Sequence, residues 1–559
     1  KLYNENYYNS SVSGELVNSS SNVYIPKIEN GDFLKYEKQT NGWIVTDKQG
    51  KKYYYGTNSG SSLDDPDDPA RIYRYMLEKV EDLNGNSINY FYYKNQGQIY
   101  PDYITYTDFM GVSGIYKIIF QRQARPDVLD SYSTAFKIKT NYRISEIDIQ
   151  TNSNITGKYV LNYAIGNNNF RSLLSSIIET KYDIFGVPKT LPPVNFSYNN
   201  STNPLYDTSS SSTVSNLFPT TYKDSGLITG DINGDSYTDV MQAYEWVYGA
   251  YSSNKKTYIY NPVNSKFETN TSFAPPTNIM NFTDDPYNKI DRGTRIIDLN
   301  GDMKSDLIKI PYYDSPDRED NTGTSWNNIT DQKKYPTYNS NPWAPVFIQD
   351  FNADGFPDVL QDSSAIWNNC GGSCAWNWAY TTKTSMNNGT EFDKKTITGH
   401  KSGLTGTYAY SPDFTGGSTH FMMDLNGDNL PDFIDARLTY TSSMFYSYKI
   451  YINTGNGWIL DNSYTMPNDF AYFNQYSSIQ FTTRMEIADF NNDGLQDILI
   501  PGRELYINQG KSFIIANLSN QTKNELGQIA SCSCANSYLM MDIDVDGDQD
   551  FIKTTNNTT

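Results

Sequence analysis

The chain has 559 residues and a formal charge of −19 at pH 7, with 63 Asp and Glu against 44 Lys and Arg. This charge repels phosphate backbones and anionic lipid headgroups, so nucleic acid is excluded as an expected partner. No apolar run approaches the roughly 18 to 20 residues that span a bilayer, and we expect no membrane insertion by this segment. The many Tyr, Phe and Trp residues among Asn, Ser, Thr and Gly are typical of a mostly β protein, and the length predicts more than one domain.

The first 40 residues give no clear pattern, and residues 1–40 are treated as an N-terminal segment without a fold assignment. The opening Lys1-Leu-Tyr-Asn-Glu has neither an initiator Met nor an apolar signal core, so we expect a processed chain or an excerpt of a longer one. Residues 41–204 contain apolar or alternating stretches between Asn/Gly turns, such as 88–92 and 159–163. They predict a β domain, either a sheet or a sandwich-like arrangement.

Three stretches of this domain need a choice. Residues 71–82 fit a helical period, but the neighbouring turns resemble hairpins, so we predict strand there. Residues 56–69, GTNSGSSLDDPDDP, are predicted to be a polar loop and not a site, because their aspartates do not alternate with other residues. Asp82-Leu-Asn-Gly-Asn86 is interpreted as a hairpin turn that binds no metal.

An acidic motif, D-x-[ND]-x-D-x-x-x-D, then occurs six times at intervals of about 50 to 75 residues. The copies are DINGDSYTD (231–239), DLNGDMKSD (298–306), DFNADGFPD (350–358), DLNGDNLPD (424–432), DFNNDGLQD (489–497) and DIDVDGDQD (542–550). Apolar strand residues follow every copy, and hairpin signals with an apolar-Asn-turn-aromatic order follow at 386–392, 451–458 and 505–513. Acidic loop plus hairpin indicates a four-stranded unit, so residues 205–559 are predicted to form a β-propeller.

We expect six blades, with seven as the alternative. The sixth motif lies close to the end of the sequence, so the last blade is predicted to be incomplete. Either strands near 205–225 or a continuation of the chain complete it.

The acidic loops are predicted to bind Ca²⁺. Side-chain oxygens at positions 1, 3, 5 and 9 and a backbone carbonyl at position 7 suit a hard cation that takes six to eight oxygen ligands. The predicted ligands in chain order are Asp231, Asn233, Asp235, Tyr237, Asp239; Asp298, Asn300, Asp302, Lys304, Asp306; Asp350, Asn352, Asp354, Phe356, Asp358; Asp424, Asn426, Asp428, Leu430, Asp432; Asp489, Asn491, Asp493, Leu495, Asp497; and Asp542, Asp544, Asp546, Asp548, Asp550.

The alternative for these loops is an Asx turn whose aspartates cap backbone amides and face water. Glycine at position 6 permits the sharp turn in the third, fifth and sixth copies (Gly355, Gly494, Gly547). The other three copies carry glycine at position 4 instead (Gly234, Gly301, Gly427), so we expect the strained residue to be displaced there.

Cysteine and histidine offer little chemistry. The four cysteines form two close pairs, Cys370 with Cys374 and Cys532 with Cys534. Four thiolates could hold zinc, but this spacing differs from the usual knuckle, and disulfide bonding in an oxidising compartment is preferred, with the pairing open. His400 and His420 are the only histidines, and no nucleophile, base and orienting group can be proposed, so we expect no enzyme.

The acidic motif in its apolar context resembles the FG-GAP/VCBS repeat of integrin-like propellers. Gly42-Trp-Ile-Val-Thr-Asp-Lys-Gln-Gly50, the stretch from Tyr75 to Asn86, and Leu191-Pro-Pro-Val-Asn-Phe-Ser-Tyr198 resemble the SpvB-like N-terminal region of Tc toxin B components and Rhs-type toxins. The resemblance implies a β framework followed by a propeller that serves as a docking platform or gate on a hollow shell.

Two functions follow as expectations. The first is a non-catalytic structural and interaction segment of a secreted or surface-exposed Tc/Rhs-like protein, whose partner is a toxin component, a shell or a cell-surface receptor. The alternative is an extracellular adhesion propeller that binds protein or glycan. Aromatic residues suited to stacking on sugars are Trp246, Trp367, Trp376 and Trp378.

Overall fold

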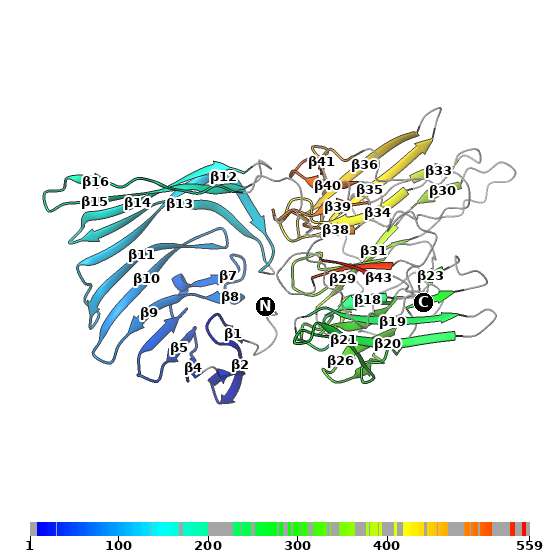
Figure 1. The fold of residues 1–559 in the computed structure, drawn as a ribbon, viewed down its shortest axis with the longest axis horizontal. Coiled ribbons are helices and arrows are strands. Elements are labelled where there is room, and N and C mark those ends of the chain that lie inside the picture. Colours follow the sequence, from blue (N-terminus) through cyan, green and yellow to red (C-terminus); the bar gives the residue numbers. More distant parts are fainter. Residues whose placement is uncertain are drawn as a thin grey trace. The chain divides into compact units, whose positions relative to one another are not determined.

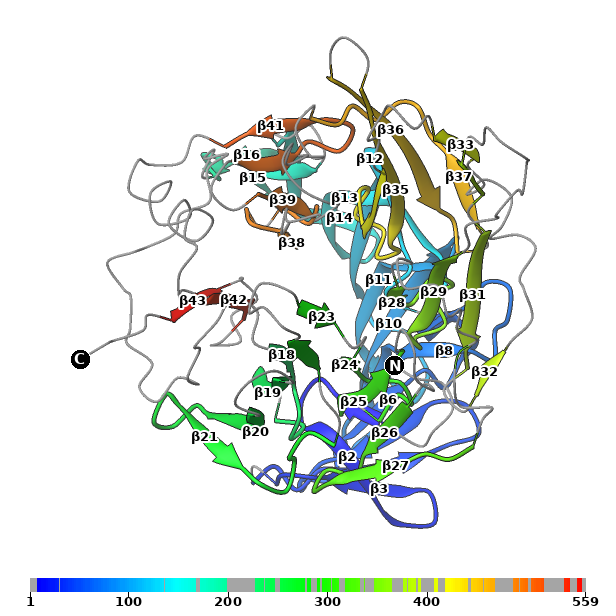
Figure 2. The ribbon, with the colours of Figure 1, turned by 90° about the vertical axis from the view of Figure 1, so that its right-hand side faces the viewer.

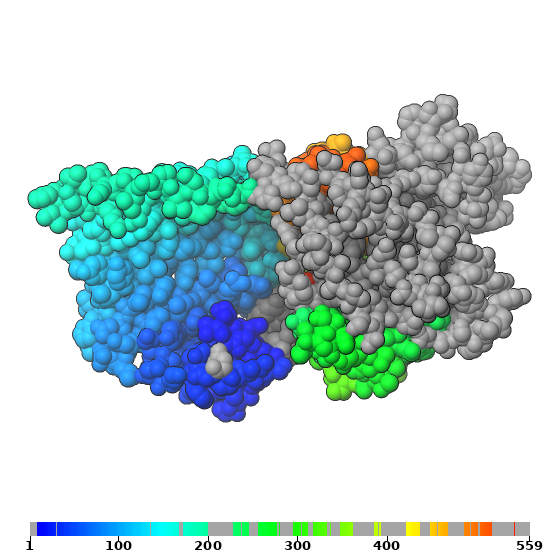
Figure 3. All heavy atoms as spheres, in the orientation of Figure 1, coloured from blue at the N-terminus to red at the C-terminus, as the bar shows by residue number. Residues whose placement is uncertain are grey.

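The computed structural model divides the chain into two compact units, residues 1–200 (unit 1) and residues 201–559 (unit 2) (Figure 1). Each unit is described by itself. The structure describes residues 8–29, 31–134, 136–166, 171–198, 227–235, 237–246, 252–276, 279–282, 289–291, 294–302, 304–310, 317–331, 336, 346–363, 376–379, 381–388, 391–393, 407–410, 418–440, 444–455, 457–467, 486–491, 493–500, 504–516, 537–542 and 550–554, and Figure 3 colours the described residues by position in the chain.

The described residues of unit 1 form strands and one short 3-10 helix. The elements are β1 (Tyr8–Ser10), β2 (Gly14–Ser20), β3 (Val23–Pro26), β4 (Lys35–Lys38), β5 (Trp43–Thr46), β6 (Lys52–Tyr55), η1 (Ser59–Ser61), β7 (Ser62–Asp64), β8 (Ile72–Tyr75), β9 (Leu77–Glu81), β10 (Asn86–Asn95), β11 (Gln98–Phe109), β12 (Tyr116–Ser131), β13 (Ile138–Thr151), β14 (Asn154–Ile165), β15 (Ser172–Tyr182), β16 (Pro188–Thr190) and β17 (Val194–Asn195). Among the described residues of the chain, no helix is long and apolar enough to cross a bilayer.

A single antiparallel sheet of 15 strands organises unit 1, in the order β1 to β6, then β9 to β16, with β17 on β15. Strands β7 and β8 form a separate pair. The sandwich-like alternative is therefore wrong for the described residues, and the sheet alternative holds. The strands from residue 8 to residue 38, which had no assignment, join the same sheet.

Long side chains explain how strands β10–β15 form an extended layer. Most residues of β13 and β15 are half-buried whichever face they occupy, so neither face is a fully buried core. Aromatic rings stack across strands instead, as Tyr106 does on Tyr116 at 5.2 Å, and the Arg122 guanidinium lies 4.4 Å from the centre of the Tyr93 ring. Cross-strand pairs of this kind stabilise a sheet face without a second layer.

Strands β2–β5 have an aromatic core of their own. It contains the buried residues Leu16, Tyr24, Tyr36, Trp43 and Val45. These positions alternate along their strands with more exposed residues, as the period of two requires. This cluster is the most deeply buried apolar part of the described sheet and fixes its N-terminal end.

The structure settles the three stretches that needed a choice. Residues 71–82 are strand, in β8 and β9, as predicted. The turn at Asp82 joins β9 to β10 as predicted, and the Asp82 carboxylate accepts the amides of Asn84 and Asn86 at 2.8 and 2.9 Å.

The prediction of a polar loop at 56–69 is right only for residues 56–58 and 65–69. Residues 59–64 of this stretch form η1 and β7. Charged groups outside the stretch bind it on both sides of these elements. The Glu78 carboxylate accepts the Asn58 amide at 3.0 Å, and the Arg71 guanidinium pairs with the buried Asp65 carboxylate at 2.9 Å.

Unit 2 is also all-β. Its strands are β18 (Leu227–Gly230), β19 (Asp239–Trp246), β20 (Ser252–Asn261), β21 (Lys266–Asn270), β22 (Met280–Phe282), β23 (Lys289–Asp291), β24 (Thr294–Ile297), β25 (Asp306–Lys309), β26 (Asp317–Asn321), β27 (Trp326–Asn328), β28 (Val346–Gln349), β29 (Asp358–Ser363), β30 (Trp376–Ala379), β31 (Thr381–Asn387), β32 (Phe392–Asp393), β33 (Thr407–Tyr410), β34 (Ser418–Met423), β35 (Asp432–Tyr440), β36 (Met444–Asn453), β37 (Trp458–Leu460), β38 (Glu486–Ala488), β39 (Asp497–Leu499), β40 (Leu505–Asn508), β41 (Phe513–Ile515), β42 (Ser537–Met541) and β43 (Asp550–Thr554).

Most of these strands form five blades in a propeller-like ring, whose arrangement Figure 2 shows, and β30 with β33 and β42 with β43 form two separate pairs. Blade 1 contains β18–β23, blade 2 β24–β27, blade 3 β28, β29, β31 and β32, blade 4 β34–β37, and blade 5 β38–β41. The predicted hairpins at 386–392, 451–458 and 505–513 are the outer two strands of blades 3, 4 and 5, so those predictions are confirmed.

The predicted count of six or seven blades differs from these five. Around the sixth motif the described residues form only the two-stranded β42–β43 sheet, which is too small to count as a blade. The Thr238 hydroxyl of blade 1 donates to the Asp542 carbonyl at 3.3 Å, so this hairpin adjoins blade 1.

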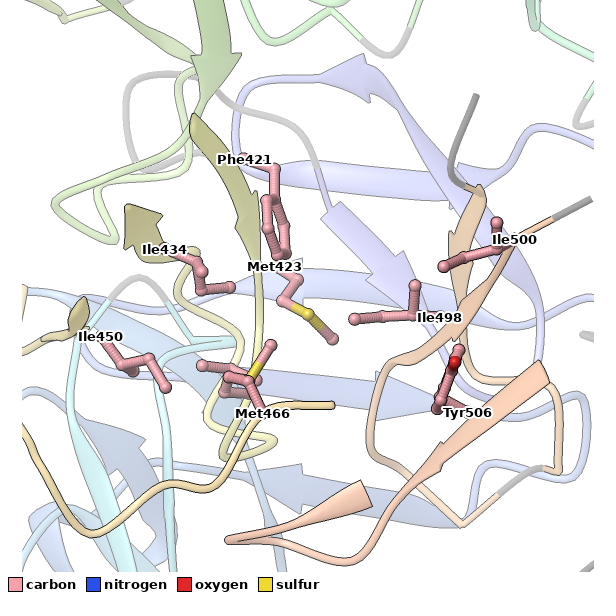
Figure 4. Packing of buried hydrophobic residues seen from close by; sticks show 9 residues of the cluster. Phe421, Met423, Ile434, Ile450, Met466, Ile498, Ile500 and Tyr506 are labelled. Atoms are coloured by element: carbon pink, nitrogen blue, oxygen red, sulfur yellow. The ribbon is translucent and has the colours of Figure 1, made fainter. Parts of the chain in front are cut away.

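The core of unit 2 lies between neighbouring blades. In the cluster of Figure 4, Met423, Ile434 and Ile450 from blade 4 face Ile498 and Tyr506 from blade 5. Each blade thus buries part of its apolar surface against the next blade, while blade 5 also has a buried cluster of its own around Leu499 and Ile507. The junctions between blades therefore contribute much of the buried apolar packing of the ring.

Gly42 provides a test of the unit 1 turn between β4 and β5. Its φ is +74°, and a Cβ there would lie 2.0 Å from the Tyr55 carbonyl oxygen. Gly14, with φ +70°, has nothing within 4 Å of such a Cβ. We expect Gly14→Ala to lower the free energy of unfolding by about 1 kcal/mol and Gly42→Ala by roughly 3 kcal/mol, since only the second adds a backbone clash to the dihedral cost.

Denaturant unfolding followed by hydrogen exchange in peptides of β2–β5 measures both changes. Equal losses for Gly42→Ala and Gly14→Ala would contradict the close approach to Tyr55.

Candidate metal centres in the acidic loops

The acidic motifs all occupy the same place in unit 2. Each joins the first strand of its blade to the second, and the ninth residue begins the second strand, at Asp239, Asp306, Asp358, Asp432 and Asp497. We call these segments loop 1 (231–239), loop 2 (298–306), loop 3 (350–358), loop 4 (424–432) and loop 5 (489–497). The prediction that an acidic loop leads into a strand in every copy is confirmed, including Asp550 at the start of β43.

The ninth aspartate is the most deeply buried part of each loop. All five of these carboxylates are 0 % exposed. One oxygen accepts the amide of position 2 in the same loop at 2.9–3.0 Å. The other accepts an amide from the third strand of the same blade at 2.7–2.8 Å. This carboxylate thus fixes the loop to its own blade.

Burial also changes the acidity of these groups. Burial raises the pKa of Asp239 and Asp306 to about 7 and that of Asp497 to about 8, although main-chain amide hydrogen bonds act in the opposite direction. For Asp358, burial and then the nearby Asp354 charge raise the pKa well above its usual range. A positive charge near these groups would lower their pKa and favour the ionised form.

The first aspartate of each loop accepts several main-chain amides. In loop 4, Asp424 accepts from Gly427 at 2.7 Å, Asp428 at 3.1 Å and Asn429 at 2.7 Å. Loop 3 has the equivalent bonds from Asp354 and Gly355 to Asp350. The Asx-turn alternative is therefore right about capping, but it does not describe the ninth aspartate, which faces no water.

Positions 3 and 5 interact with each other. In loops 1, 3, 4 and 5 the asparagine at position 3 donates its side-chain amide to the aspartate at position 5, at 2.9–3.2 Å. In loop 2 a different group takes this role: the Lys304 ammonium lies 3.0 Å from the Asp302 carboxylate. Loop 2 therefore already contains one cation of its own.

The donor set is suited to a hard cation in its chemistry. Each loop offers only oxygen ligands, and in loops 1, 3, 4 and 5 the position 3 amide donates to the position 5 carboxylate. Among the residues that the structure describes, however, no three His, Cys, Asp or Glu side chains are gathered closely enough to hold a metal ion. Calcium binding at these loops therefore stays a prediction.

The backbone of the loops differs from the expected displacement of strain. In loop 3 both Ala353 at position 4 (φ +60°) and Gly355 at position 6 (φ +90°) are left-handed. Loop 4 has Gly427 and Asn429 in the same conformation, at +72° and +70°. In loops 3 and 4 the turn therefore has two left-handed residues, and glycine fills only one of the two places.

Sequence reasoning missed one functional position, the asparagine at the end of the third strand. Asn321, Asn387, Asn453 and Asn508 supply the second amide that the ninth aspartate accepts in blades 2 to 5. The apolar-Asn-turn-aromatic signal contained three of these residues, but it was interpreted only as a hairpin. The repeated asparagine just before the turn of each of these hairpins was the signal that could have identified them.

Several predicted sites lie outside the described residues. These are position 3 to position 7 of the sixth motif (Asp544, Asp546, Asp548), all four cysteines, His400 and Trp367; of His420, Trp246, Trp376 and Trp378 only the backbone is described.

Comparison with known proteins gives a family match for the N-terminal part of the chain. Residues 12–107 match the family model described as Salmonella virulence plasmid 65kDa B protein. These residues lie in unit 1 and cover β2 to most of β11. A search of curated proteins gives no match.

Three solved structures are similar to this chain to the following extent. The Photorhabdus luminescens Tc holotoxin pore has 12% identity and a TM-score of 0.47, over 100% of this chain and 27% of that chain. The TcdB2-TccC3-Cdc42 structure has 13% identity and a TM-score of 0.41, over 89% and 28%. The N-terminal domain of SpvB from Salmonella typhimurium has 14% identity and a TM-score of 0.25, over 35% and 82%. This chain spans about a quarter of the length of the first two.

Ala353 tests the requirement for two left-handed residues. We expect Ala353→Gly to raise the free energy of unfolding of unit 2 by about 0.5 to 1 kcal/mol, because glycine adopts positive φ without a Cβ penalty. Ala488→Gly in β38 is the matched control, since it removes a similarly buried methyl from a strand, and it should destabilise. Thermal or denaturant unfolding distinguishes them, and destabilisation by Ala353→Gly would contradict the assignment.

Proposed function

We propose that this chain is a non-catalytic structural and protein-interaction segment of a secreted Tc- or Rhs-like toxin, or of a large surface protein. The observation that carries the proposal is an order of parts. A region that matches the SpvB-type family model at residues 12–107 precedes a propeller-like ring built on repeated acidic loops. The sequence resembles Tc toxin B components and Rhs-type toxins in the same order of parts. We therefore propose that the partner of this segment is a toxin component, a shell or a cell-surface receptor.

The repeated carboxylates support a structural role. The ninth aspartate of each described loop has both oxygens bound to amides of its own blade, so its place in the fold accounts for it. The first aspartate is likewise bound to loop amides. In a single copy of the motif these aspartates would be candidate catalytic acids, but here each of them has a structural role.

We further propose that Ca²⁺ binds the acidic loops and stabilises the blades. Asp350, Asn352, Asp354 and Asp358 would hold it in loop 3, with the Phe356 carbonyl, and equivalent residues would do so in the other loops. A bound cation supplies positive charge to carboxylates whose pKa burial has raised. Loop 2 should bind it least well, because Lys304 already pairs with Asp302.

We also propose that β42–β43 belongs to a sixth blade that closes the ring. The bond from Thr238 to the Asp542 carbonyl, 3.3 Å long, joins the eighth residue of one loop to the first residue of the motif before it. The Ser305 amide and the Asp231 carbonyl make the same connection between loops 2 and 1 at 3.2 Å.

Removal of calcium should lower the melting temperature of residues 205–559. A site at a hundredfold excess of ligand over Kd contributes about 2.7 kcal/mol, so loss of several sites should shift the melt clearly. Asp354→Asn should reduce the calcium-dependent part of the shift. Asp82→Asn, in the similar turn of unit 1, should leave it unchanged.

Calorimetry with and without chelator, together with metal analysis of the purified protein, decides this. An unchanged melt in excess chelator and no metal in the protein would rule out the calcium proposal.

The proposed partner can be sought with the tagged full chain. We expect bait incubated with native host extract in calcium buffer to retain specific proteins, and chelator to release them, because the blades present their binding surfaces only when their loops are ordered. Asp82→Asn bait serves as the matched control and should retain the same proteins. Bait that retains no protein but binds immobilised glycans would favour the adhesion alternative.

A further inference from the structure

The asparagines at the ends of the third strands form hydrogen bonds to the neighbouring blade. Each side-chain amide donates to the carbonyl of position 2 in the loop of the preceding blade, and all four asparagines are at most 3 % exposed. The bonds are Asn321 to Ile232 (2.7 Å), Asn387 to Leu299 (2.8 Å), Asn453 to Phe351 (2.9 Å) and Asn508 to Leu425 (3.0 Å). A contact repeated at four junctions is a property of the repeat.

The same amide also binds its own blade. Its nitrogen lies 3.1–3.3 Å from the carbonyl of position 8 in its own loop, at Ser305, Pro357, Pro431 and Gln496. The asparagine main-chain amide donates to the ninth aspartate, as described above. Asparagine has two side-chain amide hydrogens and one main-chain hydrogen, so every donor of the residue is used.

The apolar side chain at position 2 reaches the same neighbour. Phe351 of loop 3 packs with Phe433, Tyr451 and Trp458 of blade 4. In the same way Ile232 packs with Leu307 of blade 2. The next blade therefore holds position 2 twice, by its side chain and by its carbonyl oxygen.

These bonds form a continuous path through the five blades. The position 2 amide of a loop binds the ninth aspartate of its own blade, and the position 2 carbonyl binds the asparagine of the next blade. That asparagine binds the next ninth aspartate, which begins the same sequence again. In blade 1, Tyr260 stands at the place of the asparagine and donates its main-chain amide to Asp239 at 2.8 Å.

We propose that Asn321, Asn387, Asn453 and Asn508 are positioning residues that order the acidic loop of the preceding blade as well as that of their own. Loops 1 to 4 are then each held by two blades, and the order of each of these loops depends on its junction with the next blade. Only the effect on cation affinity rests on the calcium proposal. The coupling between blades stands on the hydrogen bonds alone.

Hydrogen exchange measured by mass spectrometry tests this in chelator, with the full chain. Asn453→Ala should speed exchange about tenfold in loops 3 and 4, the change expected when a buried hydrogen bond worth about 1.4 kcal/mol is lost, and leave loop 5 unchanged. Asn508→Ala should do the same in loops 4 and 5 and leave loop 3 unchanged. Each variant is therefore the control of the other. Asn453→Ser, which keeps a small polar side chain, replaces Asn453→Ala if that variant does not fold.

Ile434→Val provides a control for a general loss of stability, because it shortens a buried side chain of blade 4 and leaves the asparagine in place. It should speed exchange evenly across unit 2. The proposal is overturned if Asn453→Ala affects loop 4 alone, as a purely local role requires, or if it resembles Ile434→Val.

A second series in calcium separates this inference from the proposed function. Calcium should protect loops 3 and 4 less in Asn453→Ala than in the wild type, and protect loop 1 equally in both. If calcium changes exchange nowhere in the wild type, the calcium proposal fails, while the chelator series still decides the coupling. If wild type and Asn453→Ala are protected equally in loop 3, the asparagine does not position that loop for a cation.

Discussion

A buried carboxylate that accepts two main-chain amides is the constraint on which each blade of unit 2 depends. Asp358, for example, binds the Phe351 amide of its loop and the Asn387 amide of the third strand, at 3.0 and 2.8 Å. Asparagine at this place has only one acceptor oxygen and would leave an amide without its partner in a site that excludes water. The conformation of the loop, the start of the second strand and the position of the third strand therefore follow from one side chain.

The two units are stabilised in different ways. Unit 2 buries its apolar residues between blades, as Met423 and Ile498 show, and so depends on the contacts of its repeats with one another. Unit 1 has one compact aromatic cluster around Trp43 and otherwise an extended sheet whose faces are covered by their own long side chains. Aromatic rings on these sheet faces can stay partly exposed, because the apolar stems of Arg and Lys cover them while the charged groups remain in water.

Much of the local structure was predictable, because short-range chemistry determines it. The strand after each acidic motif, the hairpins at 451–458 and 505–513, and the turn at Asp82 depend on residues close together in the chain. The errors involved interactions that the residue pattern of a stretch does not itself display. Residues 56–69 are ordered by Glu78 and Arg71, and the sandwich alternative for unit 1 failed because alternation shows two unlike faces and not what covers them.

By itself the sequence determined the all-β class, the repeat and the place of each acidic loop before a strand, since carboxylates at alternate positions and apolar residues with a period of two are local patterns. Only the tertiary structure decided what those residues do. It shows the ninth aspartate as a buried acceptor of amides, and it joins Asn453 to Phe351 of the preceding blade, 102 residues away in the chain. Such a contact leaves no trace in spacing, because the loops between blades vary in length while the junction that they close remains the same.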